Sequence, residues 1–535
     1  MKRHKRESYY IVGEGTVYAD RKGEVYTDPK PGDVPEMRKF RFSRMGPKGK
    51  VVDRATVSGL ATAMTADPGP DSSGPAIPAG FTYLGQFIDH DLTLDRTATA
   101  LGSTVTIDEL IQGRSPALDL DCLYGRGPAD AQDSKFYSDG IRIKMGTTAP
   151  TPFPDGGTNV PRDGFDLPRV GQGSTKLERR TALIPDTRND ENLVVAQTHL
   201  AMIRFHNRVV DQIASTTPSA DLFNKARELV VKHYQWMIKT DFLPRIVDPA
   251  IVSDVFTNGR KFFEKNVTPA NMPTMPIEFS VAAYRLGHSM IRGAYQWNRV
   301  FKGGGPGPIA SLALLFTFSG TSGILSPDGD LNDRESGSFE QLPTNWIADF
   351  RRLYDFTEVG RADLVAPEGG PNVAMKLDTQ LVDPLKTLPF GSFGGPNSTP
   401  VEELNLAFRN LTRANMVELA SGQQMATLMG VAPLSTAQLS QGLPSGLSGV
   451  GKNTPLWYYI LREAELNGGK LTGVGGRIVA ETFHRAMEGS EQSIVRDATF
   501  RPTALVSNPG DRFNMTDLLL FAFEGRADLL NPLGD

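Results

Sequence analysis

The sequence predicts a mainly α-helical protein in which long loops join the helices and β-structure is scarce. From about Phe81 onward, apolar residues recur at helical spacing, whereas alternating apolar and polar runs are few and short. The 54 glycines and 38 prolines indicate long irregular connections. No Pro/Ser-rich linker interrupts the 535 residues, so we expect a single large domain with a helical core.

The expected elements follow the chain in order. Residues 1–45 are interpreted as a polar N-terminal extension, and residues 46–535 as the domain. After a helix that begins near Phe81, further helices are expected at 192–215, 220–240, 276–291, 403–421, 436–442, 456–467 and 474–488. Asp186 or Thr187 is expected to cap the helix at 192–215. Stretches dense in Gly, Pro, Ser and Asp are expected to form loops at 147–175, 303–308, 319–345, 365–399 and 443–455.

Composition excludes several functional classes. Lys and Arg number 57 and Asp and Glu 61, so the net charge is -4 and no excess of cations is available for a nucleic-acid backbone. No run approaches the roughly 18 apolar residues that a membrane helix needs. The single cysteine, Cys122, excludes an intramolecular disulfide framework. Residues 1–14 begin with a basic run but lack an apolar region, so no signal peptide is expected.

One segment carries residues suited to acid–base chemistry. Gln86 lies four residues before His90 and three before Asp89, so on a helix the three side chains share one face. An amide, a carboxylate and an imidazole on one face can position a small polar substrate and move its proton. The same three groups could also bind a divalent metal. Four of the other histidines are interpreted as packed side chains of helices: His199, His206, His233 and His484.

This segment and several later ones resemble the peroxidase–cyclooxygenase superfamily, the haem peroxidases that include myeloperoxidase, lactoperoxidase and bacterial relatives. The similar segments occur in the same order as in the family. Residues 85–91 are similar to its distal-histidine motif, 115–125 to its calcium loop and 186–191 to its catalytic-arginine segment. Residues 204–207 are similar to the next helix, 284–288 to its proximal-histidine motif, and 410–413 to the segment that holds the partner of the proximal histidine. Segments 456–465 and 474–478 resemble bacterial, peroxicin-like members. The resemblance spans about 40–530 and implies one haem peroxidase domain around haem b.

The resemblance implies a division of roles between the two sides of the haem. His288 would ligate the iron, and Asn410 would be the partner of its other ring nitrogen. Because this partner is an amide, the ferric/ferrous potential should be higher than with a carboxylate. On the distal side, His90 would accept and return the peroxide proton, and Arg188 would stabilise charge on the leaving oxygen. Gln86 would hydrogen-bond the distal water or a small anion.

Two carboxylates stand where mammalian relatives form ester bonds to the haem. By resemblance Asp89 and Glu191 would form both esters; otherwise Asp89 would form a salt bridge, and Glu191 would favour a helix N-terminus. Asn192 replaces the methionine that forms a sulfonium link in myeloperoxidase, so that link should be absent and bromide, iodide, thiocyanate or phenols should be easier donors than chloride. Arg285 and Arg413 are implied as partners of the haem propionates.

The resemblance also implies a calcium ion. Carboxylates would come from Asp91, Asp119 and Asp121, a hydroxyl and a carbonyl oxygen from Ser115, and a carbonyl oxygen from Ala117. Hard oxygen ligands at this spacing suit Ca²⁺. Because Asp91 follows the distal histidine directly, the ion would fix the distal helix. The alternative is a plain acidic loop.

Together these features imply a haem peroxidase that reduces hydrogen peroxide through a compound I intermediate and oxidises halides, pseudohalides or small aromatic donors. Two alternatives stay open: a fatty-acid oxygenase of the same superfamily and a non-catalytic haem- or calcium-binding protein. The oxygenase needs a tyrosine three residues before the proximal histidine, where this chain has Arg285. Tyr284 is turned about 100° further on a helix, so we expect it to point away from the haem. A prokaryotic monomer is expected, cytoplasmic or exported without an N-terminal signal.

Overall fold

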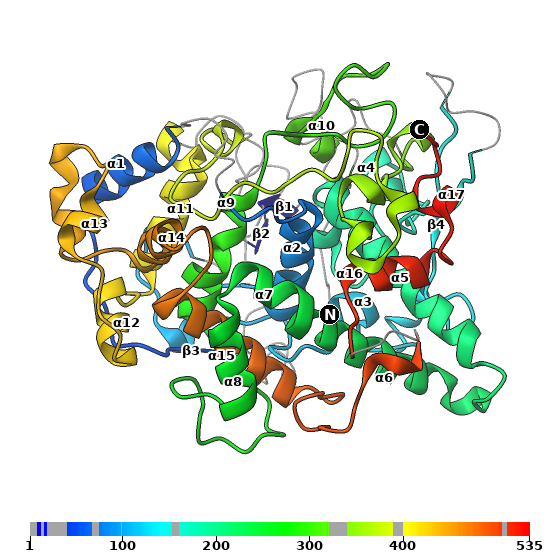
Figure 1. The fold of residues 1–535 in the computed structure, drawn as a ribbon, viewed down its shortest axis with the longest axis horizontal. Helices are drawn as coiled ribbons and strands as arrows, with labels where there is room; N and C mark the ends of the chain where they lie inside the picture. The colour runs from blue at the N-terminus through cyan, green and yellow to red at the C-terminus, as the bar shows by residue number, and fades with distance from the viewer. Residues whose placement is uncertain are drawn as a thin grey trace.

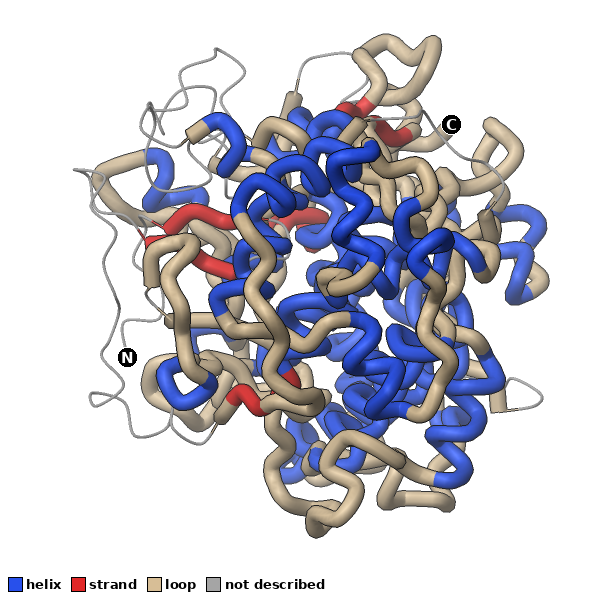
Figure 2. The backbone as a smooth tube through the Cα atoms, turned by 90° about the vertical axis from the view of Figure 1, so that its left-hand side faces the viewer, coloured by secondary structure: helices blue, strands red, loops and turns tan. Residues whose placement is uncertain are grey.

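The computed structural model describes residues 8–11, 15–18, 40–66, 74–97, 99–151, 160–317, 319, 340–388, 400–505 and 511–535. Within these residues helices dominate, and strands occur only as two-stranded pairs (Figure 2). The predicted fold class, a mainly helical single domain with little β-structure, is therefore confirmed. The predicted N-terminal extension lies largely outside the described residues, which before residue 40 comprise only the antiparallel strands β1 (Ser8–Ile11) and β2 (Gly15–Tyr18).

The helices and strands have the following limits. The helices are α1 (Arg54–Met64), α2 (Gly80–Leu92), α3 (Asp121–Tyr124), α4 (Lys176–Arg180), α5 (Leu193–Ile213), α6 (Ser219–Met237), α7 (Leu243–Ile246), α8 (Pro249–Asn258), α9 (Gly287–Met290), α10 (Leu312–Thr317), α11 (Leu406–Met416), α12 (Gly422–Met429), α13 (Thr436–Ser440), α14 (Leu456–Leu466), α15 (Gly473–Gly489), α16 (Met515–Ala522) and α17 (Ala527–Leu530). The other strand pairs are β3 (Phe42–Ser43) with β6 (Met275–Pro276), β4 (Gly146–Thr147) with β5 (Asp163–Asp166), and β7 (Ala294–Tyr295) with β8 (Ala310–Ser311). None of the helices described combines the length and apolar character needed to cross a membrane.

α5 is the central helix of the core. It packs against α2, α6 and α16, and most buried apolar side chains of the described residues join in one continuous cluster. A helix that is apolar on most sides is stable only when it is surrounded by other elements. Asn192 caps α5, because its side chain accepts from the Val195 N–H at 3.0 Å. The predicted cap at Asp186 or Thr187 is wrong, since Asp186 instead caps the 3₁₀ turn Thr187–Asp190.

Most predicted helices are present, but two differ in form. The predictions at 192–215, 220–240, 436–442, 456–467 and 474–488 correspond to α5, α6, α13, α14 and α15. The helix within 403–421 ends at Met416, and Glu418 then adopts a φ of 46° before Ser421 caps α12. Segment 276–291 contains a π turn, a 3₁₀ turn and α9 in succession. Sequence periodicity misses α1, α8, α12 and α16.

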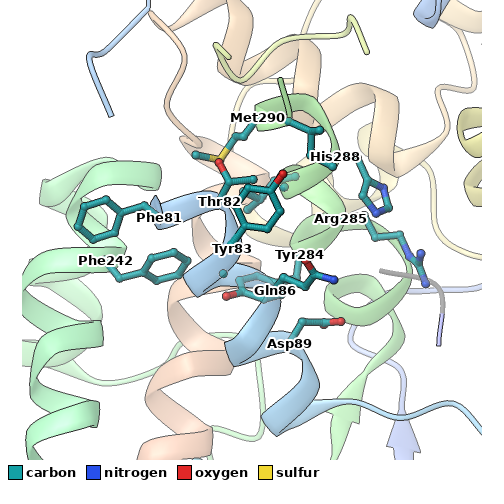
Figure 3. A pocket seen from close by; sticks show the side chains of 14 residues that line it. Phe81, Thr82, Tyr83, Gln86, Asp89, Phe242, Tyr284, Arg285, His288 and Met290 are labelled. Carbon is teal, nitrogen blue, oxygen red and sulfur yellow. The ribbon is translucent and has the colours of Figure 1, made fainter. Parts of the chain in front are cut away.

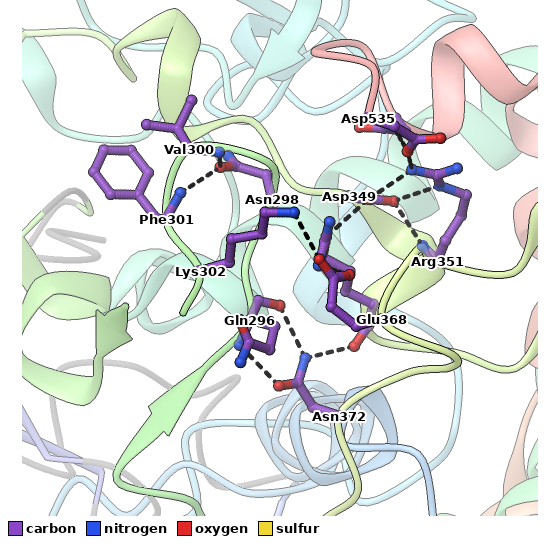
Figure 4. A network of polar contacts seen from close by, with 12 residues as sticks. Gln296, Asn298, Val300, Phe301, Lys302, Asp349, Arg351, Glu368, Asn372 and Asp535 are labelled. Carbon is purple, nitrogen blue, oxygen red and sulfur yellow. Dashed lines mark hydrogen bonds and ion pairs between the residues drawn. The ribbon is translucent and has the colours of Figure 1, made fainter. Parts of the chain in front are cut away.

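α2 lies near the middle of the molecule (Figure 1), and its start is fixed by a polar network between distant loops. The Ala79 N–H donates to the Asn372 carbonyl oxygen at 2.7 Å. The Asn372 side chain donates to the carbonyl oxygens of Gln296 at 2.9 Å and Arg352 at 2.7 Å (Figure 4). Arg352 in turn pairs with buried Asp349 at 3.1 Å. The network holds the N-terminus of α2, and with it the candidate site, against residues 296–372.

Candidate functional site

A pocket lies between α2 and the segment 284–291 (Figure 3). It encloses about 590 Å³ of atom-free space, part of which opens to solvent. Gln86 and Asp89 line it from α2, and Arg285 and His288 line it from the other segment. Its wall is otherwise largely apolar and aromatic: Phe81, Tyr83, Phe242, Tyr284, Leu286, Met290 and Ile291. Four predicted site residues from distant parts of the sequence therefore meet at one pocket.

Gln86 is held by two residues that precede α5. Its amide nitrogen donates to Glu191, and its amide oxygen accepts from Asn192 Nδ2 at 3.0 Å. Burial raises the pKa of Glu191 to about 8, although Arg188 acts in the opposite direction. Glu191 is therefore mostly a neutral acid near pH 7, and the orientation of the Gln86 amide is fixed from both ends.

Asp89 differs from Glu191 in its access to the pocket. Asp89 lines the pocket directly and accepts from Thr93 Oγ1 at 3.0 Å, whereas Glu191 contacts Gln86 and is only 1% exposed. Burial raises the pKa of Asp89, and the charges of Arg188 and Arg285 oppose the increase. Of the two carboxyl groups, Asp89 is the more directly placed to react with a group in the pocket.

His90 follows Asp89 in α2 and is not one of the side chains that line the pocket. It is 2% exposed, and its Nδ1 lies 2.8 Å from Asn189 Oδ1. Burial and the neighbouring Arg188 charge lower the pKa of His90 to about 3, so the imidazole is neutral near pH 7. Since an amide oxygen only accepts, His90 carries its proton on Nδ1 and has a lone pair on Nε2. This is the form that a general base needs.

Arg188 is a buried cation beside His90. Its Nη2 donates to the His90 carbonyl oxygen at 3.0 Å, and its Nε and Nη2 donate to Asp186 at 3.0 and 2.7 Å. Arg114 also pairs with Asp186. Burial alone would raise the pKa of Asp186, but the two guanidinium groups outweigh it and hold this pKa well below its usual range. The distal region therefore contains a fixed positive charge next to a neutral imidazole.

The structure brings His288 and Asn410 together on the opposite side. His288 Nδ1 lies 2.9 Å from Asn410 Nδ2, and Arg285 Nη1 donates to Asn410 Oδ1 at 3.0 Å. With the amide turned this way its nitrogen donates to Nδ1, which leaves the imidazole proton on Nε2. A metal ligand at Nε2 needs the other tautomer. Metal binding there thus requires the Asn410 amide to turn over, so that its oxygen accepts from Nδ1–H.

Tyr284 lines the same pocket as His288, so the expectation that it points away from the site is wrong. Its ring stacks on Phe279 with centroids 4.6 Å apart, and its buried hydroxyl has no hydrogen-bond partner among the described residues. The expectation was based on the angle of about 100° on a helix between Tyr284 and position 285, where the oxygenases have their tyrosine. Relative to His288 itself, a residue four positions earlier lies on the same helical face.

The comparisons with known proteins agree with this geometry. Residues 92–304 match the family model described as animal haem peroxidase. The match contains Arg188 and His288, begins two residues after His90 and ends before Asn410.

Individual relatives of the family match the chain only in part. A peroxidase-like protein of Margaritifera margaritifera is 26% identical over 334 residues, which are 54% of this chain and 39% of that protein. Human myeloperoxidase is 25% identical over 201 residues, 36% of this chain and 25% of that protein. The matched regions thus span well under half of the length of these curated relatives.

Solved structures share the fold over most of the chain. Peroxidase A of Dictyostelium discoideum has a TM-score of 0.53 and 14% identity, covering 89% of this chain and 90% of that one. A fatty acid α-dioxygenase of Arabidopsis thaliana has a TM-score of 0.56 and 11% identity, covering 92% and 78%. The haem peroxidase fold therefore extends beyond 92–304, and proteins of two activities share it.

The pocket suits the haem that is typical of the animal haem peroxidase family. His288 offers an imidazole on one wall, and Phe81 and Phe242 offer apolar surface. Arg285, 8% exposed, places a cation in the wall, where a propionate could pair with it. The structure does not place Arg413 in this wall; Arg413 pairs with Asp95 at 2.6 Å instead.

Replacing Asn410 with Asp is expected to lower the ferric/ferrous potential of the haem-loaded protein. A carboxylate only accepts, so it would fix the Nδ1–H tautomer of His288 and give the imidazole more imidazolate character. A spectroelectrochemical titration measures the midpoint potential. The control is Asn415→Asp on the same helix, whose side chain bonds the backbone of Val52. An unchanged or higher potential in Asn410→Asp alone would contradict the assigned pairing.

The predicted calcium residues lie next to α2, all of them buried except Asp121, which is half-buried. Asp91 accepts from the N–H groups of Leu120 at 3.2 Å and Cys122 at 3.5 Å, and Asp119 accepts from Ser490 Oγ at 2.6 Å. Burial raises the pKa of Asp91 and Asp119, and the Asp121 charge raises both further. Among the described residues no three carboxylate, imidazole or thiol side chains converge closely enough to hold an ion. The calcium assignment stays a prediction.

Several residues around the distal histidine are not singled out by sequence reasoning. Asp186 and Asn189 lie within 186–191, the segment similar to the catalytic-arginine motif. Their contacts join α2 to the start of α5, so they depend on the fold. Arg114 comes from a loop more than 70 residues earlier than Asp186 in the chain. His199 is interpreted from sequence as a packed side chain, yet its Nδ1 lies 2.9 Å from Asn189 Nδ2. Spacing along one helix carries no signal for such contacts.

Proposed function

We propose that this protein is a haem peroxidase that reduces hydrogen peroxide and oxidises small aromatic donors or the easily oxidised anions bromide, iodide and thiocyanate. One observation carries the proposal. A neutral His90 with a free Nε2 lone pair stands beside the buried Arg188 cation, and His288 lies in the opposite wall of the adjoining pocket. A base, a fixed positive charge and a metal-binding imidazole are the three groups that peroxide cleavage requires.

The residues divide the work of breaking the O–O bond. Haem held through His288 would supply the two electrons that the bond takes up. His90 Nε2 accepts the proton of the first peroxide oxygen and returns it to the second, which leaves as water. Arg188 stabilises negative charge as it develops on the leaving oxygen, and its pair with Asp186 keeps the guanidinium in place. Gln86, fixed by Glu191 and Asn192, orients the peroxide or a small anion.

Two features support the choice of donors. Asn192 occupies the position of the sulfonium-forming methionine of myeloperoxidase and uses its amide to hold Gln86 instead. The pocket wall carries Phe81, Tyr83 and Phe242, against which an aromatic donor could pack. Phenols, bromide, iodide and thiocyanate are thus preferred to chloride as donors.

The proposed function is tested by the absorption spectrum of haem-loaded protein before and after one equivalent of hydrogen peroxide. An immediate change of a stoichiometric Soret band, reversed by a phenol or bromide, is the expected result. A Soret band that does not respond to peroxide would overturn the proposal and favour a haem-binding protein without this activity.

Haem is expected to be linked covalently through Asp89 and Glu191. Glu191 is buried, and the half-buried Asp89 lines the pocket. After turnover with peroxide, acidified butanone should extract little haem from the wild type, part of it from Asp89→Ala or Glu191→Gln, and nearly all from the double variant. Mass spectrometry of proteolysed protein identifies each ester. Complete extraction from wild-type protein would exclude both links.

Calcium is expected to stabilise the distal helix through the loop 115–121. Buried Asp91 and Asp119 and half-buried Asp121 destabilise one another through like charge, and a divalent cation would remove this repulsion. Metal analysis should find one Ca²⁺ per chain, and chelation should slow the peroxide reaction while haem stays bound. Asp91→Asn should reproduce the effect. A metal-free preparation with the full peroxide rate would contradict the assignment.

A second candidate function is fatty-acid oxygenation, favoured by Tyr284 alone. Its phenol lines the pocket, and its hydroxyl has no partner among the described residues. Tyr284→Phe separates the two functions. Oxygen uptake with palmitic acid that is lost in this variant would favour the oxygenase, whereas an unchanged peroxide reaction and no oxygen uptake favour the peroxidase.

A further inference from the structure

Asn189 joins two buried histidines, one of which has no place in the mechanism above. Its Oδ1 lies 2.8 Å from His90 Nδ1, and its Nδ2 lies 2.9 Å from His199 Nδ1. The three residues come from α2, the 3₁₀ turn Thr187–Asp190 and α5. Asn189 and His199 are 0% exposed and His90 is 2% exposed, so water does not compete for these bonds.

The amide links the tautomers of the two histidines. The amide oxygen only accepts, so His90 must carry its proton on Nδ1. The amide nitrogen only donates, so His199 Nδ1 must be unprotonated and the His199 proton must lie on Nε2. If the amide turned over, both assignments would be exchanged. His90 would then carry its proton on Nε2 and could no longer accept one there.

We infer that His199 is a positioning residue that keeps His90 in its proton-accepting tautomer by holding the Asn189 amide in one orientation. The inference rests on the proposed function of His90 as the base for hydrogen peroxide. His199 itself does not line the pocket, and its Nε2 has no partner among the described residues. Its hydrogen bond is directed to Asn189, while its ring packs edge-on against Phe87 with centroids 5.7 Å apart.

A double-mutant cycle in haem-loaded protein tests the inference. His199→Leu removes the acceptor for Asn189 Nδ2, so the amide can turn over and part of the protein holds His90 in the wrong tautomer. The rate constant of the peroxide reaction should fall about 10-fold, the lower end of the range for residues that orient a ligand or base through another residue. His199→Asn, which restores an amide oxygen near the Nδ1 position, should recover most of the rate.

Asn189→Asp distinguishes tautomer control from packing. A carboxylate accepts at both oxygens, so in this background His90 keeps its Nδ1 proton whatever stands at position 199. His199→Leu should therefore have little effect on the rate in the Asn189→Asp background. Equal slowing in both backgrounds, or no slowing in either while wild-type protein reacts with peroxide, overturns the inference and leaves the proposed function intact.

A second readout does not depend on activity. In the full-length chain without haem, labelled with ¹⁵N-histidine, His90 should show a protonated Nδ1 and His199 a protonated Nε2. His90→Gln and His199→Leu assign the signals. His199→Leu should shift the His90 nitrogens towards a tautomer mixture, whereas His199→Asn should not. A His90 Nε2–H signal in wild-type protein overturns the inference, and a wild-type holoprotein inert to peroxide overturns both proposals.

Discussion

His90→Ala is expected to slow the reaction with hydrogen peroxide by ~10²–10⁴-fold, the usual contribution of a positioned general base. The imidazole is the neutral base next to the pocket, with Nδ1–H bonded to Asn189 and Nε2 left as the acceptor. Alanine cannot take the peroxide proton, while His288 still offers the metal ligand. Stopped-flow recording of the Soret band measures the rate, and the band before mixing shows that haem remains bound.

The control for His90→Ala is another buried histidine on a neighbouring helix. His206 is 0% exposed, with Nδ1 3.0 Å from the Tyr124 hydroxyl and Nε2 2.9 Å from the Ile141 carbonyl oxygen. His206→Gln should leave the peroxide rate within about 2-fold, because this histidine only packs and bonds α5 to a loop. Equal slowing in both variants would mean that loss of a buried imidazole, and not of a base, causes the effect.

The pH dependence of the wild-type rate tests the same base. His90 accepts a proton only while it is unprotonated, and its pKa is lowered from 6.5 to about 3 by burial and then by Arg188. The rate should therefore stay level as the pH falls past 6.5 and decline only towards about 3. A decline centred near 6.5 would indicate an exposed histidine as the base.

The sequence is sufficient to predict the parts of the site that lie on one element. Helical spacing places Gln86 and Asp89 on one face of α2, and both line the pocket. Pairing across the fold cannot be obtained this way, because residues 122 positions apart, such as His288 and Asn410, are joined only by packing. That pair comes from the family resemblance and not from periodicity.

Other failures have identifiable physical causes. Segment 276–291 changes from π to 3₁₀ to α geometry within thirteen residues from Glu278 to Met290, which periodicity with a single helical period does not detect. Two capping residues, Asp186 and Asn192, precede α5, and only the intervening 3₁₀ turn decides which of them starts the helix. Tertiary contacts settle such local choices, so they follow from the fold.

Arg188→Leu is expected to slow the peroxide reaction by ~10²–10³-fold, the usual cost of removing one fixed donor from developing negative charge. The effect should exceed that of Arg188→Lys, which keeps a positive charge but loses the two-atom bond to Asp186. Stopped-flow rates with hydrogen peroxide measure both variants. In addition, the loss of a buried ion pair should lower the unfolding temperature of Arg188→Leu.

Arg114→Leu separates the charge beside His90 from the support of Asp186. Arg114 pairs with the same buried carboxylate but has no bond to α2, whereas Arg188 also donates to the His90 carbonyl oxygen at 3.0 Å. Both variants leave Asp186 with one cation, so both should lose thermal stability. Only Arg188→Leu should lose the peroxide rate. If Arg114→Leu slowed the reaction as much, Arg188 would act by supporting the 3₁₀ turn and not by stabilising charge on peroxide.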